Sequence, residues 1–262
     1  MPEGHLYHRL ARNLNAFTGC ELAACSPQGR FTEGAAQING TRLEVAEAHG
    51  KHLLVRLAGG RTVHVHLGMR GKLLRVADPS RPPRPQVRLR LAGATAAWDL
   101  IAPATCELLD DTGVAQLLGR LGPDPLREDA DPERVWANLQ AAPGALGAAL
   151  LDQAVIAGIG NVFRAEALFV CGLHPARPAA SLTRDEFDRL WATVRAMMRR
   201  SLDAGRLLTV ETPAGQPAFT DPADVPRYVY MQARCRRCGA AVQSWTLGGR
   251  TAYACPVDQP VA

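Results

Sequence analysis

The sequence lacks the features of a membrane or secreted protein. No apolar run approaches the roughly 20 residues that a membrane-spanning helix needs, and no signal peptide opens the chain. Only three of the 7 cysteines have metal-ligand spacing, and without a secretion signal the thiols are expected to stay reduced. These absences predict a cytoplasmic protein that does not bind membranes.

Two kinds of ligand-binding pattern are also missing. No Walker or Rossmann glycine pattern follows an expected strand, which argues against a phosphate-binding metabolic enzyme. No helix carries a dense face of Arg, Asn and Gln, which argues against a zinc-ribbon regulator that reads DNA sequence.

Lysine is scarce, since Lys51 and Lys72 are the only two among 30 basic side chains. The formal net charge is nevertheless +5, and it is unevenly distributed. Residues 1–120 carry a net charge of +5, residues 121–230 a net charge of −3, and residues 231–262 a net charge of +3. The two ends of the chain are therefore expected to face a polyanion.

The first residues offer a nucleophile. Removal of Met1 is expected before a small residue, and it would leave Pro2 as a terminal secondary amine. Free α-amino groups titrate at about pH 8, and the positive end of the helix expected over Glu3–Asn15 would lower this pKa further. Such an amine attacks a carbonyl-like carbon and forms an iminium, with Glu3 beside it as proton donor or acceptor. The alternative is an ordinary proline and acid in a first helical turn.

Residues 20–108 predict a β-sandwich or barrel-like domain. Short alternating runs are separated by Gly, Pro and Asn, which is typical of all-β domains. The expected strands are Arg42–Ala46, His52–Leu57, Thr62–His66, Lys72–Val76, Val87–Leu91 and Ala96–Ile101. The Pro- and Arg-rich segment Asp78–Pro85 is expected to form a loop.

Two turns in this region carry side chains suited to a nucleic acid. Lys51 follows a glycine at a strand entrance and could hold a phosphate, although a solvated hairpin lysine has the same pattern. Glycines on both sides of Met69 and Arg70 predict a tight projecting loop, and an apolar wedge beside an arginine suits insertion into a base stack. His64 and His66 share one strand face and are expected to be packed or hydrogen-bonded rather than metal-bound.

A helical domain is expected to begin at Leu121–Leu126. Its clearest helix is Arg184–Ala204, with a capping box formed by Thr183 and Glu186. A second helix is expected to restart after a glycine-containing turn, with Asn161 as its N-cap. Backbone N–H groups at such a helix start bind anions, although any helix corner also needs glycine.

The C-terminal segment has the spacing of a zinc module. Cys235, Cys238 and Cys255 follow a C-x2-C-x16-C pattern, and Asp258 occupies the position of a fourth ligand. The intervening Gly248–Arg250 predicts a hairpin tip that ends in arginine, suited to a phosphate contact. The alternative is a metal-free loop held by aromatic packing.

These motifs together resemble the formamidopyrimidine-DNA glycosylase/endonuclease VIII family of bacterial base-excision repair enzymes. The resemblance covers nearly the whole chain and keeps the family order. The motifs that carry it are Met-Pro-Glu-Gly at the start, Gly50-Lys51, His66-Leu67-Gly68-Met69, Leu151-Asp152-Gln153, Gly158-Ile159-Gly160-Asn161, and Arg250 within Gly-Arg-Thr-Ala-Tyr-Ala-Cys.

The resemblance implies an α+β multidomain fold bound to DNA in the cleft between domains. The expected parts are a β-sandwich with an N-terminal helix (residues 1–120), a helix–two-turns–helix domain (residues 121–230) and a β-hairpin zinc finger with one structural zinc (residues 231–262). It also implies a nucleoid-associated monomer whose partner is double-stranded DNA containing oxidised bases or abasic sites.

The resemblance further implies the chemistry of a bifunctional glycosylase. The damaged nucleotide is flipped out of the duplex, Pro2 attacks C1′ of its sugar, and Glu3 protonates the ring oxygen. β- and δ-elimination then cleave the strand on both sides. The implied DNA contacts are phosphate binding by Lys51, Asn161 and Arg250, and filling of the vacated base position by Met69.

Oxidised pyrimidines are the expected substrates. The Met-Pro-Glu-Gly-His opening resembles the endonuclease VIII side of the family, and the purine enzymes' Arg/Phe loop is missing from Asp99–Ala104. Thr209–Arg227 carries no lid signature. The alternatives are an 8-oxoguanine/formamidopyrimidine glycosylase, since Met69 also occurs on the purine side, and a non-catalytic DNA-binding relative.

Overall fold

The computed structural model describes residues 2–211 and 226–261, which divide into two compact units. The first unit comprises Met1–Glu3 and Tyr7–Arg120, and the second comprises Gly4–Leu6 and Leu121–Ala262. Residues 1, 212–225 and 262 lie outside the described residues, and so does most of the Thr209–Arg227 segment. The sequence-based division into three domains stays a prediction.

The first unit is a β-sandwich with an N-terminal helix. Its helical elements are α1 (Gly4–Leu14, whose first three residues belong to the second unit), η1 (Asn15–Phe17), α2 (Thr32–Ile38) and α3 (Asp111–Gly119). Its strands are β1 (Glu21–Cys25), β2 (Thr41–His49), β3 (His52–Leu57), β4 (Arg61–His66), β5 (Lys72–Val76), β6 (Val87–Ala92), β7 (Ala97–Ile101) and β8 (Thr105–Leu109).

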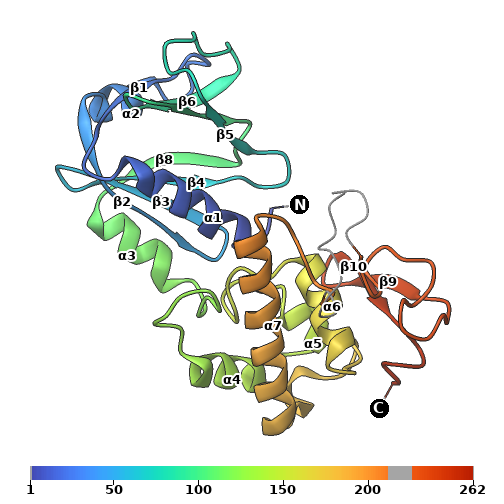
Figure 1. The fold of residues 1–262 in the computed structure, drawn as a ribbon. Coiled ribbons are helices and arrows are strands. Elements are labelled where there is room, and N and C mark those ends of the chain that lie inside the picture. Colours follow the sequence, from blue (N-terminus) through green and yellow to red (C-terminus); the bar gives the residue numbers. More distant parts are fainter. Residues whose placement is uncertain (1, 212–225, 262) are drawn as a thin grey trace. The chain divides into compact units, whose positions relative to one another are not determined.

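The strands form two layers because the sheet bends at β1. The strand order is β5-β7-β6-β1-β2-β3-β4-β8. The first two residues of β1 pair with β2 and its last three pair with β6, so this strand passes from one layer to the other (Figure 1). Apolar side chains of both layers fill the interior, namely Leu53, Val55, Val63, Val65, Leu89, Leu91, Trp98 and Leu100.

The outer face of β3 and β4 is covered as well. Leu54 points away from the sandwich interior and packs against Val114 and Leu117 of α3. Asp110 caps this helix by accepting a hydrogen bond from the backbone N–H of Gly113 at 2.8 Å. Because both faces of β3 are covered, the three consecutive residues Leu53–Val55 are all buried.

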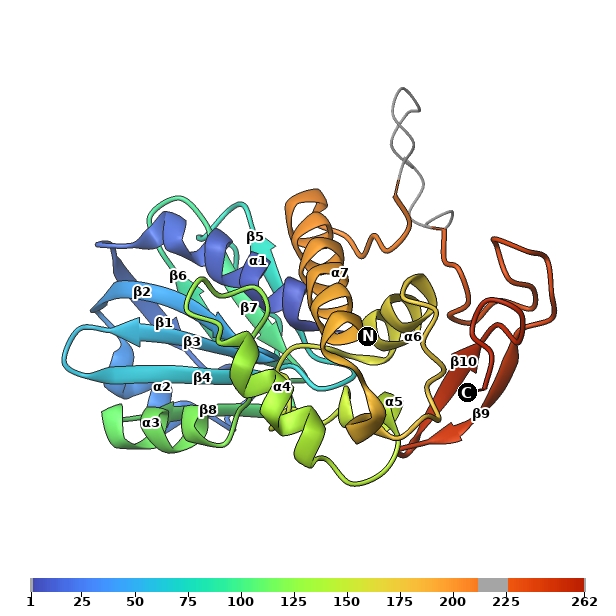
Figure 2. The same cartoon turned by 90° about the horizontal axis from the view of Figure 1, so that it is seen from below.

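The second unit is helical and ends in a β-hairpin. Its elements are α4 (Pro132–Ala141), α5 (Leu146–Ala149), α6 (Asn161–Val170), η2 (Ala179–Ser181), α7 (Arg184–Ala204), β9 (Gln243–Leu247) and β10 (Arg250–Ala254). Helices α6 and α7 pack together, and β10 lies beside α6 (Figure 2). The predicted α+β fold class, with sandwich, helical region and C-terminal hairpin, is confirmed.

Helix α7 begins and ends where local signals predict. Thr183 accepts a hydrogen bond from the backbone of Glu186, whose carboxylate accepts one from the backbone of Thr183. Gly205 ends the helix with a φ of 66°, in the left-handed region that favours glycine. The capping box and the C-terminal glycine are therefore both present.

The predicted start of α6 is wrong by one residue. The N-cap is Gly160, and Asn161 is the first helical residue. Turns rather than a long helix lead into this point, because the preceding α5 contains only 4 residues. An asparagine N-cap would use its side-chain oxygen on its own helix, whereas the Asn161 side chain is bonded elsewhere.

Within residues 2–211 and 226–261, no helix combines the length and apolar character needed to cross a bilayer.

Candidate functional site

The chain start places Pro2 and Glu3 directly before a helix. Glu3 is the N-cap of α1 in an extended conformation, and its side chain is fully buried, whereas Pro2 is half-buried. The positive end of a helix dipole therefore lies next to the Pro2 nitrogen. The Pro2 nitrogen and the buried Glu3 carboxyl group therefore both lie at the start of α1.

Gly4 fixes the position of the first helical turn within the second unit. Its backbone N–H donates to the carbonyl of Gly158 at 2.9 Å. A Cβ atom on Gly4 would lie 2.9 Å from both Gly158 Cα and Met198 Cε, which is too close for any side chain. The fourth residue of the Met-Pro-Glu-Gly motif is thus required by packing.

The Leu67–Gly71 turn projects an apolar side chain. Gly71 donates its backbone N–H to the Leu67 carbonyl at 3.0 Å, and a Cβ on Gly71 would lie 2.3 Å from that oxygen. Gly68 has a φ of 65°. Met69 is 66% exposed and Arg70 is exposed, so the turn presents both side chains to solvent as the sequence predicts.

Tyr7 holds this turn against α1. Its hydroxyl accepts a hydrogen bond from the backbone N–H of Leu67 at 2.9 Å, and burial raises the pKa of Tyr7 to about 12, so the hydroxyl remains neutral. Tyr7 follows Glu3 by about one helical turn, roughly 6 Å along the axis. The chain start and the Met69 turn are therefore linked within the first unit.

Lys51 occupies a two-residue hairpin turn between β2 and β3. His49 and His52 form the last cross-strand pair, and Gly50 adopts a φ of 58° at the first turn position. This position of a two-residue hairpin favours glycine, which explains the Gly-Lys sequence. Lys51 is partly exposed at the tip.

The histidines beside this turn form a hydrogen-bonded chain. His64 joins Glu107 through Nδ1 at 2.8 Å and His52 through Nε2 at 2.8 Å. His66 accepts a hydrogen bond from the backbone N–H of Gly68 through Nδ1 at 3.1 Å. His64 and His66 are thus hydrogen-bonded as predicted, and neither belongs to a group of neighbouring metal-ligating side chains among the described residues.

Burial of His52 makes stability depend on pH. Burial, followed by the charges of His64, His66, His49 and Arg120, lowers the pKa of His52 to about 3. The unfolded chain takes up this proton at about pH 6.5, whereas the folded protein takes it up only near its lowered pKa. The stabilisation is therefore present above the unfolded pKa and is lost as the pH falls toward 3.

We expect the free energy of unfolding to fall by up to about 1 kcal/mol per pH unit below pH 6.5 through His52 alone. The variant His52→Gln removes this titration and should show a correspondingly flatter dependence between pH 6.5 and 5. Urea unfolding at a series of pH values measures both slopes. Parallel curves for the two proteins would contradict the assignment.

Asn161 connects α6 to the C-terminal hairpin. It is 7% exposed, its Nδ2 donates to the carbonyl of Thr251 at 3.0 Å, and its Oδ1 accepts a hydrogen bond from Arg164. Arg250 is the exposed first residue of β10, next to Thr251. The structure thus brings the two predicted phosphate ligands of the second unit to neighbouring parts of the fold.

Two buried charged residues of α6 were missed by the sequence analysis. Arg164 is 1% exposed, and its guanidinium donates to the carbonyls of Gly147, Leu247 and Thr251. Glu166 is fully buried, and its carboxylate accepts four hydrogen bonds, three from the backbone of residues 228–230 and one from Thr209. Charged side chains within the otherwise apolar run 162–170 were the available signal.

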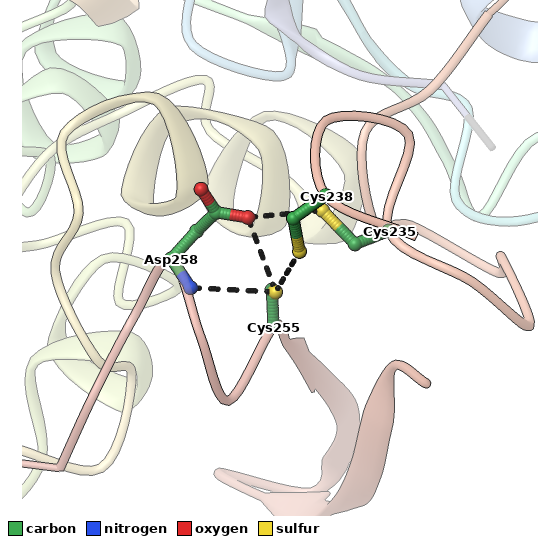
Figure 3. A group of neighbouring side chains, drawn as sticks. All are labelled: Cys235, Cys238, Cys255 and Asp258. Atoms are coloured by element: carbon green, nitrogen blue, oxygen red, sulfur yellow. Dashed lines mark hydrogen bonds between the residues drawn. The ribbon is translucent and has the colours of Figure 1, made fainter. Parts of the chain in front are cut away.

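The C-terminal cysteines and Asp258 form a compact ligand group (Figure 3). Asp258 Oδ2 lies 3.1 Å from the sulfur of Cys235 and 3.2 Å from that of Cys255, and the sulfurs of Cys238 and Cys255 are 3.4 Å apart. All four ligand atoms lie within 4.8 Å of one another.

This geometry fits a tetrahedral metal site. With metal–sulfur bonds of about 2.3 Å, the edges of a zinc tetrahedron measure about 3.8 Å, close to the observed separations. Backbone N–H groups of Arg237 and Asp258 each point at a cysteine sulfur at 3.4 Å, as expected around thiolates. The four residues could therefore hold one metal ion.

Known protein families match the two units. Residues 1–100 match the model of the formamidopyrimidine-DNA glycosylase N-terminal domain, and residues 121–212 match that of the formamidopyrimidine-DNA glycosylase H2TH domain. Both are domains of formamidopyrimidine-DNA glycosylases, so the class of protein is a DNA glycosylase of base excision repair.

Individual relatives cover almost the whole chain. The Endonuclease 8 1 proteins of Mycobacterium tuberculosis and Mycobacterium bovis are each 43% identical over 269 residues, covering 99% of this chain and 100% of the relative. A formamidopyrimidine-DNA glycosylase of Thermomicrobium roseum is 30% identical over 254 residues, covering 87% and 85% of the two chains. The chain belongs to the formamidopyrimidine-DNA glycosylase/endonuclease VIII family.

Solved structures share the fold at low sequence identity. Lactococcus lactis Fpg in complex with an abasic site containing DNA has a TM-score of 0.79 at 21% identity, and the same enzyme with DNA containing an oxidised pyrimidine has a TM-score of 0.80 at 22% identity. Both comparisons cover 99% of this chain and 100% of the other.

Proposed function

We propose that this protein excises oxidised bases from double-stranded DNA and cleaves the strand at the resulting abasic site. The main observation in support of this proposal is the chain start, where Pro2 precedes a buried glutamate at a helix N-terminus. Membership of a glycosylase family supports the proposal, as do the DNA complexes of structurally similar enzymes. The place of action is the cytoplasm, at the bacterial nucleoid, and the enzyme acts as a monomer.

The chemistry begins with covalent attack by Pro2. With Met1 removed, the Pro2 nitrogen attacks C1′ of the flipped nucleotide, and the bond from C1′ to the base breaks. Glu3 donates a proton to the ring oxygen as the C1′–O bond breaks, which leaves an iminium between Pro2 and the opened sugar. Loss of a C2′ proton then permits β-elimination of the 3′ phosphate, and δ-elimination releases the 5′ phosphate.

Three side chains hold the DNA backbone in this proposal. Lys51 binds a phosphate as a compact charge at its hairpin tip, and Arg250 binds another from the end of β10. Asn161 contributes at the start of α6, where the hydrogen bonds to Thr251 and Arg164 set its side-chain orientation. These phosphate contacts determine where the damaged nucleotide lies along the protein.

The Leu67–Gly71 turn fills the gap that the flipped base leaves. Met69 is exposed and flexible, so it can enter the base stack, while Arg70 contacts the adjacent backbone or bases. In the second unit, Cys235, Cys238, Cys255 and Asp258 hold one structural zinc that fixes the hairpin carrying Arg250. The zinc takes no part in the covalent steps.

Oxidised pyrimidines are the preferred lesions. The segment Asp99–Ala104, where the purine enzymes' Arg/Phe loop is expected, consists of the end of β7 and the three residues before β8. This connection contains neither an arginine nor a phenylalanine that could stack on an orphaned base. The similarity to Endonuclease 8 1 proteins over 99% of the chain supports the same substrate class.

We expect faster excision of thymine glycol or dihydrouracil than of 8-oxoguanine paired with cytosine. Single-turnover rates on otherwise identical duplexes measure this preference, with an unmodified duplex as the control. A higher rate on 8-oxoguanine would assign the protein to the purine-specific side. Absence of cleavage on every lesion and on abasic DNA would favour a non-catalytic DNA-binding relative.

A further inference from the structure

A polar ladder crosses the outer face of the sheet behind the Lys51 turn. His64 lies directly opposite Glu107 on β8, and His52 lies diagonally across from His64 on β3. Leu54, on the same face, packs under α3, so the part of the face around His64 is covered, whereas Glu107 is exposed. His64 is only 3% exposed. The buried His64 ring in such a place requires a hydrogen-bond partner for each of its two nitrogens.

The Glu107 carboxylate sets the direction of the first hydrogen bond in the ladder. The Glu107 carboxylate can only accept, so the Nδ1–H of His64 donates to it. Where Nε2 of His64 carries no proton, it is an acceptor, and His52 donates its Nδ1–H to it. One carboxylate at the solvent-facing end thereby keeps a proton on Nδ1 of His64, and His64 links it to His52.

The inner end of the ladder reaches the residues around Lys51. His52 follows Lys51 in sequence and forms the last cross-strand pair before the turn. The His52 ring lies 5.1 Å from the His64 ring and 5.2 Å from the His66 ring. His66 in turn accepts the Gly68 N–H, at the start of the turn that carries Met69.

We propose that the Glu107–His64–His52 ladder positions Lys51 for its phosphate contact. The tip of a two-residue hairpin moves readily. A flexible lysine at such a tip contributes little to the free energy of DNA binding through a single charge contact unless its backbone is held in place. The ladder anchors the first residue after the turn to β4 and β8. His52, His64 and Glu107 are therefore positioning residues that do not touch the DNA. This inference rests on the proposed phosphate role of Lys51.

The salt dependence of DNA binding tests this role directly. Each phosphate contact to duplex DNA contributes about 0.9 to the slope of log K against log salt concentration. Lys51→Ala should reduce the magnitude of this slope by about 0.9, the contribution of one phosphate contact. His64→Leu should reduce it by a similar amount, and the double variant should show little further reduction, because both changes remove the same contact. The probe is a duplex containing an uncleavable abasic-site analogue.

Matched variants separate positioning from general destabilisation. Thr62 is buried two residues before His64 on the same strand face, so Thr62→Val tests perturbation of the strand without breaking the ladder. Its salt slope should equal that of the wild type. Glu107→Gln keeps an acceptor for His64 and should also keep the slope. His52→Phe keeps a ring but removes the donor, and it provides a second ladder variant if His64→Leu does not fold.

The outcomes distinguish the two levels of the proposal. A reduced slope in Lys51→Ala with an unchanged slope in folded ladder variants overturns the positioning role alone. An unchanged slope in Lys51→Ala overturns the phosphate role of Lys51 and the inference with it. Reduced slopes that add fully in the double variant show independent contacts, and they also overturn the inference.

Discussion

A protein with one extra residue ahead of Pro2 should form no borohydride-trapped adduct with lesion-containing DNA. The extra residue converts the Pro2 nitrogen into an amide, which has no nucleophilic lone pair for attack on C1′. The buried Glu3 and the helix that follows remain in the sequence, so the change acts on the nitrogen itself. Trapping with sodium borohydride, read as a shifted band on a denaturing gel, measures the effect.

A removable extension provides the matched control. A protease site placed so that cleavage leaves Pro2 at the terminus allows the same preparation to be assayed before and after cleavage. Adduct formation should be absent before cleavage and restored afterwards, while affinity for an uncleavable duplex stays within a few-fold. Equal trapping in both states would show that another residue is the nucleophile.

The second large effect should follow loss of metal from the C-terminal hairpin. We expect purified protein to contain about one zinc per chain, and Asp258→Ala to bind it at least about tenfold more weakly, since even changes beyond the ligands commonly cost about 10–100-fold. A carboxylate is a harder donor than a thiolate, so Cys255→Ser should cost more than Asp258→Ala. Competition with a colorimetric chelator measures these affinities.

The controls come from the same segment. Val257 is 65% exposed in the turn that leads to Asp258, and Val257→Ala should leave zinc binding unchanged. Cys20 is an exposed cysteine of the first unit, so Cys20→Ser controls for the loss of a thiol. Chelation should weaken DNA binding, because the hairpin that carries Arg250 depends on the metal for its order. Zinc-free protein that binds and cleaves normally would contradict the metal assignment.

Local signals in the sequence were sufficient to predict several elements. The expected bounds of β3, β5 and α7 agree with the structure, because short apolar runs bounded by Gly or Pro and a capping box are both encoded within a few positions. Strand β1 was missed because its alanine-rich segment Glu21–Cys25 fully buries only Leu22. Strand β8 was missed because no residue in it is fully buried.

Long-range contacts could not be predicted in this way. The same-face placement of His64 and His66 follows from strand periodicity, but the partner Glu107 is 43 residues away and becomes visible only through the pairing of β4 with β8. The N-cap error at Asn161 has a similar origin, since that side chain bonds to Thr251, 90 residues later. These contacts depend on topology rather than on local sequence.

Arg164 has a consequence for the exchange of parts between related enzymes. Its guanidinium donates to backbone carbonyls at both ends of the hairpin turn, Leu247 and Thr251, as well as to Asn161. A hairpin grafted onto a chain without this arginine would keep two partly buried carbonyl groups that lack their donor. Helix α6 and the β9–β10 hairpin should therefore be transferred together in any chimera, although some 70 residues of chain separate them.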